Sequence, residues 1–324
     1  MNAARIDVHL DEAAAGRSLR AEAAAGLTAA RRTLSSMWLY DARGSELFEA
    51  ITRLPEYYPT RAERAALNRA AVDIAEIVEA DTLIELGSGA AEKTRLLLDA
   101  MGKQGALRRF VPFDVSAAAL RGSAADIAAD YPDLEVHGIV GDFTRHLHTL
   151  PGGGRRLLAF LGGTIGNLLP AERAAFLAEA RQALQPGEWL LLGTDLVKPE
   201  ATLIAAYDDA QGVTAEFNRN VLRVLNRELA ADFDPERFQH VAHWDAEAEW
   251  IEMRLRAKSA SRVRIAALGL TVDFAEGEEL RTEVSAKFRP ETVTAELGAA
   301  GFRLHRQWTD PDGLFAVSLA EADR

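Results

Sequence analysis

The sequence contains no cysteine among its 324 residues. Disulfide bonds, thiolate catalysis and cysteine-ligated zinc or iron–sulfur sites are therefore excluded. It also has no stretch of about 18 consecutive apolar residues, and residues 1–8 lack a basic region followed by an apolar one. We therefore expect a soluble protein that neither crosses a membrane nor is exported, with a cytoplasmic location.

Basic residues are also fewer than acidic ones. The chain has 37 Lys and Arg against 49 Asp and Glu, which gives a formal net charge of -12. Nucleic-acid binding requires a basic face, so we expect no nucleic-acid partner and favour a small-molecule substrate. The histidine pairs His146/His148 and His240/His243 do not belong to complete ligand sets, and we expect no metal.

What the sequence does contain is enough apolar material for a substantial core. Hydrophobic residues make up 48% of the chain, and its length fits one large domain or two of ordinary size. Residues 10–34 and 38–53 are rich in helix-forming residues or show helical spacing of apolar positions. Pro55 and Pro59 then flank a rigid loop with paired tyrosines, whose simplest role is to cover the edge of the core. Thr60 is expected to cap a helix over 61–78.

From residue 83 onward, short apolar stretches alternate with helical patterns. This alternation predicts an α/β fold with a doubly wound parallel sheet, whose ligand crevice lies at the carboxyl ends of the strands. The predicted strands are 83–86, 107–114, 134–140, 155–161 and 189–195, and the predicted helices are 92–101, 116–129 and 170–184.

The period of the apolar pattern changes in the second half of the chain. Residues 198–230 are predicted to be helical, whereas 238–275 alternate as strands do, which marks an insertion. A helix from Pro290 to 300 and two antiparallel return strands, 302–308 and 314–319, then complete the sheet. The expected domains are 61–196 plus 287–324, and 1–60 plus 197–286.

Four predicted strand ends carry residues suited to an adenosine. The Gly87-Ser88-Gly89 turn exposes backbone amides, and Asp114 can accept hydrogen bonds from both ribose hydroxyls. Asp142 can accept from an exocyclic amine and Phe143 can pack on a base. The fourth is the glycine-rich segment that ends at Asn167. Taken singly, each acid has a plainer alternative as a helix cap or a solvated loop residue, and Asp114 stands directly before a predicted helix.

The glycine turn argues against two common nucleotides. A dinucleotide fingerprint requires a third glycine where this chain has Glu92, and a phosphate-binding loop requires a glycine before Lys93-Thr94. S-adenosylmethionine carries no phosphate and has a sulfonium cation, so an acid at Glu85 suits it better.

Several segments together resemble the histidine-specific methyltransferases of ergothioneine biosynthesis, and the resemblance covers nearly the whole chain. The departure from the general class I methyltransferase motif is Ala91, which stands in place of a third glycine. The segments are Glu-Leu-Gly-Ser-Gly at 85–89, Phe-Asp-Val-Ser at 113–116, Gly-Asp-Phe at 141–143, Phe-Leu-Gly-Gly-Thr-Ile-Gly-Asn at 160–167, Leu-Pro-Glu-Tyr-Tyr-Pro-Thr at 54–60, Tyr-Asp-Asp at 207–209 and Glu-Val-Ser-Ala-Lys-Phe at 283–288.

The resemblance implies a class I methyltransferase (Rossmann-like) fold with a second, α+β substrate-binding domain. It implies that S-adenosylmethionine is bound by Gly87, Lys93, Asp114, Asp142 and Phe143. It also implies that L-histidine is bound by Tyr57, Asn167, Tyr207, Glu283 and Ser285, in a pocket further lined by Tyr40, Phe48, Gly162, Thr164 and Met253. Tyr40 and Asn167 are the catalytic candidates.

The implied histidine residues make physical sense. Glu283 and Ser285 are two apart on a strand, so they point to one face and can grip both imidazole nitrogens. A tyrosine hydroxyl and an asparagine amide can donate to the substrate carboxylate. The implied reaction is successive methylation of the α-amine, through methylated intermediates, to N-alpha-trimethylhistidine (hercynine) by a monomer. The alternatives are a methyltransferase for another amino acid, such as tryptophan, or a catalytically silent ligand-binding module.

Overall fold

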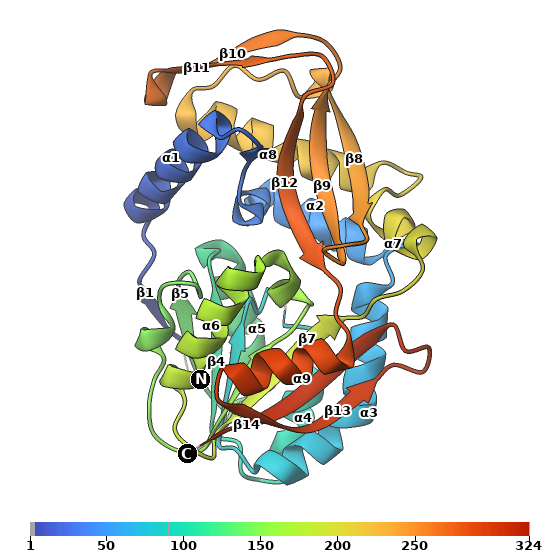
Figure 1. Ribbon diagram of the computed structural model, residues 1–324. Coiled ribbons are helices and arrows are strands. Elements are labelled where there is room, and N and C mark those ends of the chain that lie inside the picture. The colour runs from blue at the N-terminus through green and yellow to red at the C-terminus, as the bar shows by residue number, and fades with distance from the viewer. Residues whose placement is uncertain (1–3, 90, 324) are drawn as a thin grey trace. The chain divides into compact units, whose positions relative to one another are not determined.

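The computed structural model describes residues 4–89 and 91–323 (Figure 1). The chain divides into two compact units. Unit 1 comprises Met1–Leu10, Pro59–Val197 and Lys287–Arg324, and unit 2 comprises Asp11–Tyr58 and Lys198–Ala286. Each unit is therefore assembled from segments that are far apart in the sequence.

Unit 1 is built on one eight-stranded sheet, with the strand order β1-β5-β4-β3-β6-β7-β14-β13. All pairs from β1 to β7 are parallel, and β14 and β13 are the antiparallel return strands, which confirms the predicted sheet. The strands are β1 (Arg5–Val8), β3 (Thr82–Leu86), β4 (Arg109–Asp114), β5 (Glu135–Val140), β6 (Arg156–Phe160), β7 (Trp189–Asp195), β13 (Phe302–Thr309) and β14 (Phe315–Ala322).

The first strand departs from the expected division, which assigned residues 1–60 to the second domain. Residues Arg5–Val8 form β1, which pairs in parallel with His137–Val140 of β5. The Nε2 atom of His137 also lies 2.8 Å from an Asp7 carboxylate oxygen. This contact lowers the pKa of Asp7, with help from the Arg5 guanidinium and against the effect of burial. A four-residue strand at a sheet edge gives too short an alternation to be recognised in the sequence.

Apolar strands and helices build the core of unit 1. The strands β3 to β7 are buried along most of their length, so their side chains form nearly continuous apolar stretches rather than alternating ones. Helices α6 and α9 pass in front of the sheet in Figure 1. The longest helix begins at Pro59, where a missing N–H costs nothing, and not after the expected cap Thr60. The helices are α3 (Pro59–Val78), α4 (Thr94–Lys103), α5 (Ala117–Asp130), α6 (Pro170–Ala183) and α9 (Pro290–Ala299).

Unit 2 combines a four-stranded sheet, in the order β2-β12-β9-β8, with a two-stranded hairpin, β10-β11. The predicted β-alternation of 238–275 is confirmed as four strands. Its elements are α1 (Glu12–Thr28), β2 (Arg32–Thr33), α2 (Ala42–Thr52), α7 (Glu200–Tyr207), α8 (Val213–Leu229), β8 (Phe238–Asp245), β9 (Trp250–Ala257), β10 (Ser261–Ile265), β11 (Leu270–Phe274) and β12 (Glu279–Ala286).

Two helical predictions for unit 2 were too long. The helix expected over 10–34 ends at Thr28, because the chain folds back over Gly26 to form β2 beside β12. A Cβ atom on Gly26 would lie 1.9 Å from the carbonyl oxygen of Thr33, so the return requires a glycine there. The stretch 198–230 is split into α7 and α8 by a turn in which Gly212 has φ 74°.

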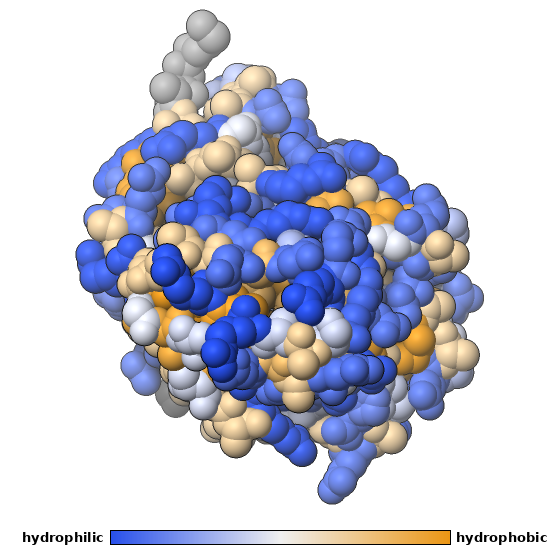
Figure 2. All heavy atoms as spheres, turned by 90° about the horizontal axis from the view of Figure 1, so that it is seen from above, coloured by the Kyte–Doolittle hydropathy of each residue, from blue (hydrophilic) through white to orange (hydrophobic). Residues whose placement is uncertain are grey.

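The surface agrees with the acidic, charge-rich composition. Figure 2 shows a face that is mostly hydrophilic, with small apolar areas between charged side chains. Of the large hydrophobic residues that the structure describes, only Val8 and Val72 are exposed. Within residues 4–89 and 91–323, no helix is both long enough and apolar enough to span a lipid bilayer.

Candidate active site

In unit 1, the turn after β3 presents its backbone without side chains in the way. Gly87 and Gly89 have φ values of 69° and 48°, and Ala91 follows with φ 53°. The N–H of Gly87 donates to the Phe113 carbonyl oxygen at 2.7 Å, which fixes the turn to β4. Nothing lies within 4 Å of an ideal Cβ on Gly87 or Gly89, so their backbone conformation, and not crowding, requires glycine.

Asp114, at the end of β4, joins two loops. One carboxylate oxygen accepts from the N–H of Gly89 at 3.0 Å and the other from the N–H of Ser116 at 2.9 Å. Burial raises the pKa of Asp114, and these backbone hydrogen bonds oppose that rise. The helix cap is Ser116, whose hydroxyl accepts from the N–H of Ala119. The alternative role of Asp114 as the cap of α5 is therefore wrong.

The loop after β5 holds the next two predicted residues. A carboxylate oxygen of Asp142 accepts from the N–H of Thr144 at 2.8 Å and from its hydroxyl at 2.7 Å, which closes a tight turn. The ring of Phe143 packs edge-on against Phe160, at 5.0 Å between centroids, and against Phe176, at 5.7 Å. Phe143 is thus held by an aromatic cluster and remains partly exposed.

Glu85 is a buried acid within β3. It is 3% exposed and accepts a hydrogen bond from the Thr94 hydroxyl. Burial raises the pKa of Glu85 to about 8, although the Thr94 hydrogen bond and the charge of Lys93 act in the opposite direction. Near neutral pH the carboxyl group is therefore mostly protonated and adds little negative charge to the turn.

Glu63 contacts two of the predicted site residues, although it was not itself among them. It lies on α3, is 1% exposed, forms an ion pair with Lys93 and accepts a hydrogen bond from the N–H of Gly162. A signal was present in the sequence, because Glu63 interrupts the apolar stripe of its helix, three and four residues before the buried Ala66 and Leu67. This carboxylate links α3 to the start of α4 and to the loop after β6.

The glycine-rich loop after β6 carries the three predicted histidine-site residues of unit 1. Gly162 and Gly163 have φ values of 77° and 67°. The hydroxyl of Thr164 donates to the Leu161 carbonyl at 3.0 Å, and Asn167 ends a short 3-10 helix, Thr164–Asn167. Left-handed conformations at two consecutive positions explain why the segment requires paired glycines.

Unit 2 brings four of the predicted pocket residues into one aromatic cluster. The ring of Phe48 lies 5.4 Å from that of Tyr40 and 6.1 Å from that of Tyr57, and Tyr57 lies 6.3 Å from Tyr207. Phe217 of α8, which was not among the predicted site residues, completes the cluster at 5.3 Å from Tyr40. Its only sequence signal was an apolar position on a helix.

The neighbouring Tyr58 has a different role from Tyr57. It is 7% exposed, and the amine of Lys198 lies 4.5 Å from its ring centroid. Tyr58 therefore fits the simpler role of covering the edge of the core, whereas Tyr57 belongs to the aromatic cluster.

The strands β9 and β12 carry the remaining predicted residues. Met253 of β9 pairs with Glu283 of β12, and Glu283 is 8% exposed. The hydroxyl of Ser285 lies 2.7 Å from that of Tyr207, the last residue of α7. A register shift between Arg281 and Glu283 marks a β-bulge immediately before this pair, a feature that redirects side chains near functional sites.

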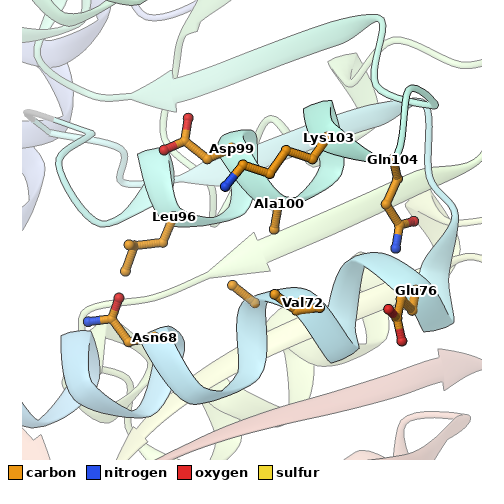
Figure 3. Close-up of a pocket in the computed structure, with 9 residues that line it drawn as sticks. Asn68, Val72, Glu76, Leu96, Asp99, Ala100, Lys103 and Gln104 are labelled. Carbon is orange, nitrogen blue, oxygen red and sulfur yellow. The ribbon is translucent and has the colours of Figure 1, made fainter.

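Two other features of the described residues lie apart from these clusters. Figure 3 shows a surface hollow between α3 and α4, and none of the predicted site residues lines it. Within residues 4–89 and 91–323, no group of three or more His, Asp or Glu side chains is placed to hold a metal ion. The hollow is lined by Asn68, Ala71, Val72, Glu76, Leu96, Asp99, Ala100, Lys103 and Gln104.

The sheet and its strand ends define a class of protein. The strand order reverses between β4-β3 and β6-β7, a glycine turn follows β3 and an acid ends β4, as in the nucleoside-binding domain of class I, Rossmann-like methyltransferases. The family described as histidine-specific, SAM-dependent methyltransferases matches residues 19–322, and the chain belongs to this family.

Individual relatives agree with this assignment. The chain is 59% identical to a histidine N-alpha-methyltransferase of Mycolicibacterium smegmatis, over 94% of this chain and 95% of that protein. It is 56% identical to one of Mycobacterium tuberculosis, over 96% and 97% of the two chains. It is also 33% identical to ergothioneine biosynthesis protein 1 of Neurospora crassa, over 60% of this chain and 23% of that protein.

Similarity to solved structures is looser. An S-adenosylmethionine-dependent methyltransferase from Clostridium acetobutylicum is 11% identical and superposes with a TM-score of 0.47, over 86% of this chain and 99% of that one. The family assignment rests on the sequence matches and not on this superposition.

Proposed function

We propose that the protein transfers methyl groups from S-adenosylmethionine to the α-amino group of L-histidine, in three successive steps that give N-alpha-trimethylhistidine (hercynine) for ergothioneine biosynthesis. The observation that carries the choice of substrate is the buried pair Glu283 and Ser285, beside Tyr207, in a chain of the histidine-specific family. A buried acid next to hydroxyl groups suits an imidazole, which offers one N–H donor and one acceptor nitrogen.

The residues of unit 1 fit the methyl donor. Gly87 and Gly89 leave open space at their Cα atoms, as close approach of a ligand to the backbone requires. The Ser88 hydroxyl is buried without a hydrogen-bond partner among the described residues, so it has an unused capacity for a ligand. We assign the ribose hydroxyls to Asp114 and the adenine to Asp142 and Phe143, while Lys93 lies at the start of α4.

For L-histidine, we propose distinct roles for the polar residues. Glu283 and Ser285 hold the imidazole, and Tyr57 and Asn167 donate to the carboxylate without adding charge. Tyr207 orients Ser285 through their hydroxyl contact of 2.7 Å. The further residues proposed for histidine are Tyr40, Phe48 and Met253 in unit 2 and Gly162 and Thr164 in unit 1. Because an analogue without imidazole nitrogens would leave Glu283 buried and unpaired, the site discriminates against apolar isosteres.

The chemistry required of the protein is mainly positioning. S-adenosylmethionine supplies a methyl group on a sulfonium, so each transfer forms an N–C bond, breaks a C–S bond and releases S-adenosylhomocysteine. The α-ammonium group of histidine must lose a proton before each transfer, which frees the lone pair. Tyr40 and Asn167 are the proposed catalytic residues, whose oxygen atoms orient the amine by accepting hydrogen bonds from the N–H groups that it still carries. Alignment of this kind accounts for large rate accelerations without a charged acid.

The experiment that tests this function is mass spectrometry of L-histidine incubated with the protein and S-adenosylmethionine. We expect mono-, di- and trimethylated histidine to appear in sequence, and no product when tryptophan replaces histidine. If tryptophan were methylated and histidine were not, the substrate would be another amino acid. Calorimetric binding of both ligands without any product would instead identify a silent binding module.

A further inference from the structure

We propose that Asn218 and His240 are positioning residues that fix Tyr207 and strand β12 in the geometry needed to bind histidine. This inference rests on the proposed function, because it concerns the residues assigned to the substrate. Neither residue belongs to the aromatic cluster or to the Glu283–Ser285 pair. They act on those residues indirectly, through hydrogen bonds within unit 2.

His240 holds the end of α7. Its Nε2 atom lies 2.7 Å from the Tyr207 carbonyl oxygen, and its Nδ1 atom lies 2.8 Å from the Asn218 amide nitrogen. A carbonyl oxygen only accepts, so Nε2 carries the proton and Nδ1 accepts from Asn218. The ring is therefore neutral in this arrangement, and burial lowers the pKa of His240, which keeps it so. Both ring nitrogens are used, and the backbone of Tyr207 is held by one of them.

Asn218 carries the connection to β12. Its amide nitrogen also donates to the Arg254 carbonyl oxygen at 3.1 Å, and its amide oxygen accepts from the Thr282 hydroxyl. These partners determine the orientation of the amide, because Arg254 offers only an acceptor there. Thr282 is the extra residue of the β-bulge and directly precedes Glu283. The amide of Asn218 therefore sets the position at which β12 turns toward the proposed imidazole site.

Together these hydrogen bonds connect Tyr207 to β12 by two separate routes. On one side, the Tyr207 hydroxyl meets Ser285 of β12 at 2.7 Å. On the other, the Tyr207 carbonyl is joined through His240, Asn218 and Thr282 to the same strand. Asn218 and Thr282 are completely buried and His240 is 6% exposed, so water does not compete for these bonds. Loss of His240, Asn218 or Thr282 leaves Tyr207 joined to β12 through its hydroxyl group alone.

The test is steady-state kinetics of the 324-residue protein with His240→Leu, which removes both ring nitrogens at similar size. We expect the KM for histidine to rise about tenfold, because the Tyr207 carbonyl loses its hydrogen bond from the ring, while the KM for S-adenosylmethionine and the kcat at saturating histidine stay within about twofold. His240→Gln is the conservative variant, since its amide can both donate and accept, and we expect it to restore most of the affinity. His243→Leu, at an exposed position three residues further along β8, is the matched control and should behave as the wild type.

A second variant changes Thr282, the residue of this hydrogen-bond network that lies on β12, and provides a test if His240→Leu does not fold. Thr282→Val removes the hydroxyl with little change of shape, and we expect about a threefold or greater rise in the KM for histidine alone. Thr271→Val, at an exposed position of β11, is its control. An unchanged KM for histidine in either folded variant would overturn the inference, as would an equal loss of affinity for both substrates. If the wild type yields no methylated histidine, the proposed function itself has failed, and that result is seen before any variant is made.

Discussion

At the scale of single residues, the two buried acids Glu283 and Glu63 have different expected effects. Glu283 lies on β12 in unit 2, whereas Glu63 lies on α3 in unit 1, beside the residues assigned to the methyl donor. Substitution of each should therefore affect a different substrate. The distinction can be measured because the two substrates have separate KM values.

Glu283→Ala should weaken the use of histidine far more than the binding of S-adenosylmethionine. Removal of a charged hydrogen-bonding partner from a buried site predicts a loss of roughly 10- to 100-fold in kcat/KM for histidine. Kinetics with each substrate varied in turn would show it, with calorimetry for S-adenosylmethionine. Unchanged histidine kinetics would contradict the role assigned to Glu283.

Glu63→Gln should weaken the binding of S-adenosylmethionine by about tenfold. The variant keeps the size of the side chain but loses the ion pair with Lys93, and one orientation of its amide also loses the acceptor for the N–H of Gly162. Calorimetric titration with S-adenosylmethionine measures the effect. Glu76→Gln, at an exposed position of the same helix, is the control, and equal affinities in the two variants would refute the prediction.

Glu85 predicts a pH dependence of stability. The pKa of Glu85 is about 8 in the folded protein against an ordinary value of 4.5, so between these pH values the folded state holds a proton that the unfolded state has lost. The free energy of unfolding therefore falls as the pH rises through this range, by at most about 1.4 kcal/mol per pH unit from this group. Its contribution is fully present below the unfolded pKa and is lost as the pH rises through the folded pKa.

Glu85→Gln removes this titration. Relative to the wild type, the variant should gain about 2 kcal/mol of stability between about pH 5.5 and about pH 7.5. Chemical denaturation of both proteins without ligands at the two pH values provides the measurement. A stability difference that does not change with pH would show that Glu85 ionises normally in the folded protein.

At the scale of elements, α1 contains two glycines whose replacement by alanine should change the stability of the protein in opposite directions. A Cβ atom on Gly26 would meet the Thr33 carbonyl at 1.9 Å, whereas nothing lies within 4 Å of one on Gly16. Gly26→Ala should displace β2 from β12 and destabilise the protein by about 1–3 kcal/mol or more. Gly16→Ala should stabilise it by about 0.5–1 kcal/mol, through helix propensity.

Thermal and urea denaturation of the two alanine variants would test this pair directly. Gly16→Ala is the matched control, because it makes the same chemical change in the same helix. Similar stabilities for the two variants would mean that the return of the chain over Gly26 does not depend on close backbone contact.

At the scale of the whole molecule, unit 2 is contributed by two insertions into the sequence of unit 1. The ends of the longer insertion are held together within unit 1, because Leu196 pairs with Phe288 and the N–H of Val197 donates to the Phe288 carbonyl at 3.0 Å. A buried ion pair between Asp195 and Lys287, at 3.0 Å, reinforces this junction. A short linker could therefore replace residues 198–286.

We predict that residues 59–197, joined by a short Gly/Ser linker to residues 287–324, fold and bind S-adenosylmethionine but not histidine. All residues proposed for the methyl donor lie in this part, whereas Tyr57, Tyr207, Glu283 and Ser285 do not. Circular dichroism through a thermal transition and calorimetry with each ligand are the measurements. A fragment without a cooperative transition would show that unit 1 depends on unit 2 for its stability.

The sequence by itself determined the parallel sheet and the turn at its centre. The strands from β3 to β7 are buried along most of their length, so each appears as a short apolar stretch that local patterning reveals. Gly87 and Asp114 could be placed because strand ends in this fold share one edge of the sheet. Composition alone excluded thiol chemistry, because there is no cysteine.

Only the tertiary structure decided the contacts between segments distant in sequence. The strand β1 depends on pairing with β5 far along the chain, and the bulge in β12 depends on its register with β9. Phe217 and the pair Asn218–His240 looked like ordinary helix or strand positions until folding placed their partners beside them. Glu63 stood out as an acid within an apolar stripe, but its partner Lys93 is set only by the fold. Local sequence patterns record the burial of a residue, but a hydrogen bond between remote residues depends on the packing that brings them together.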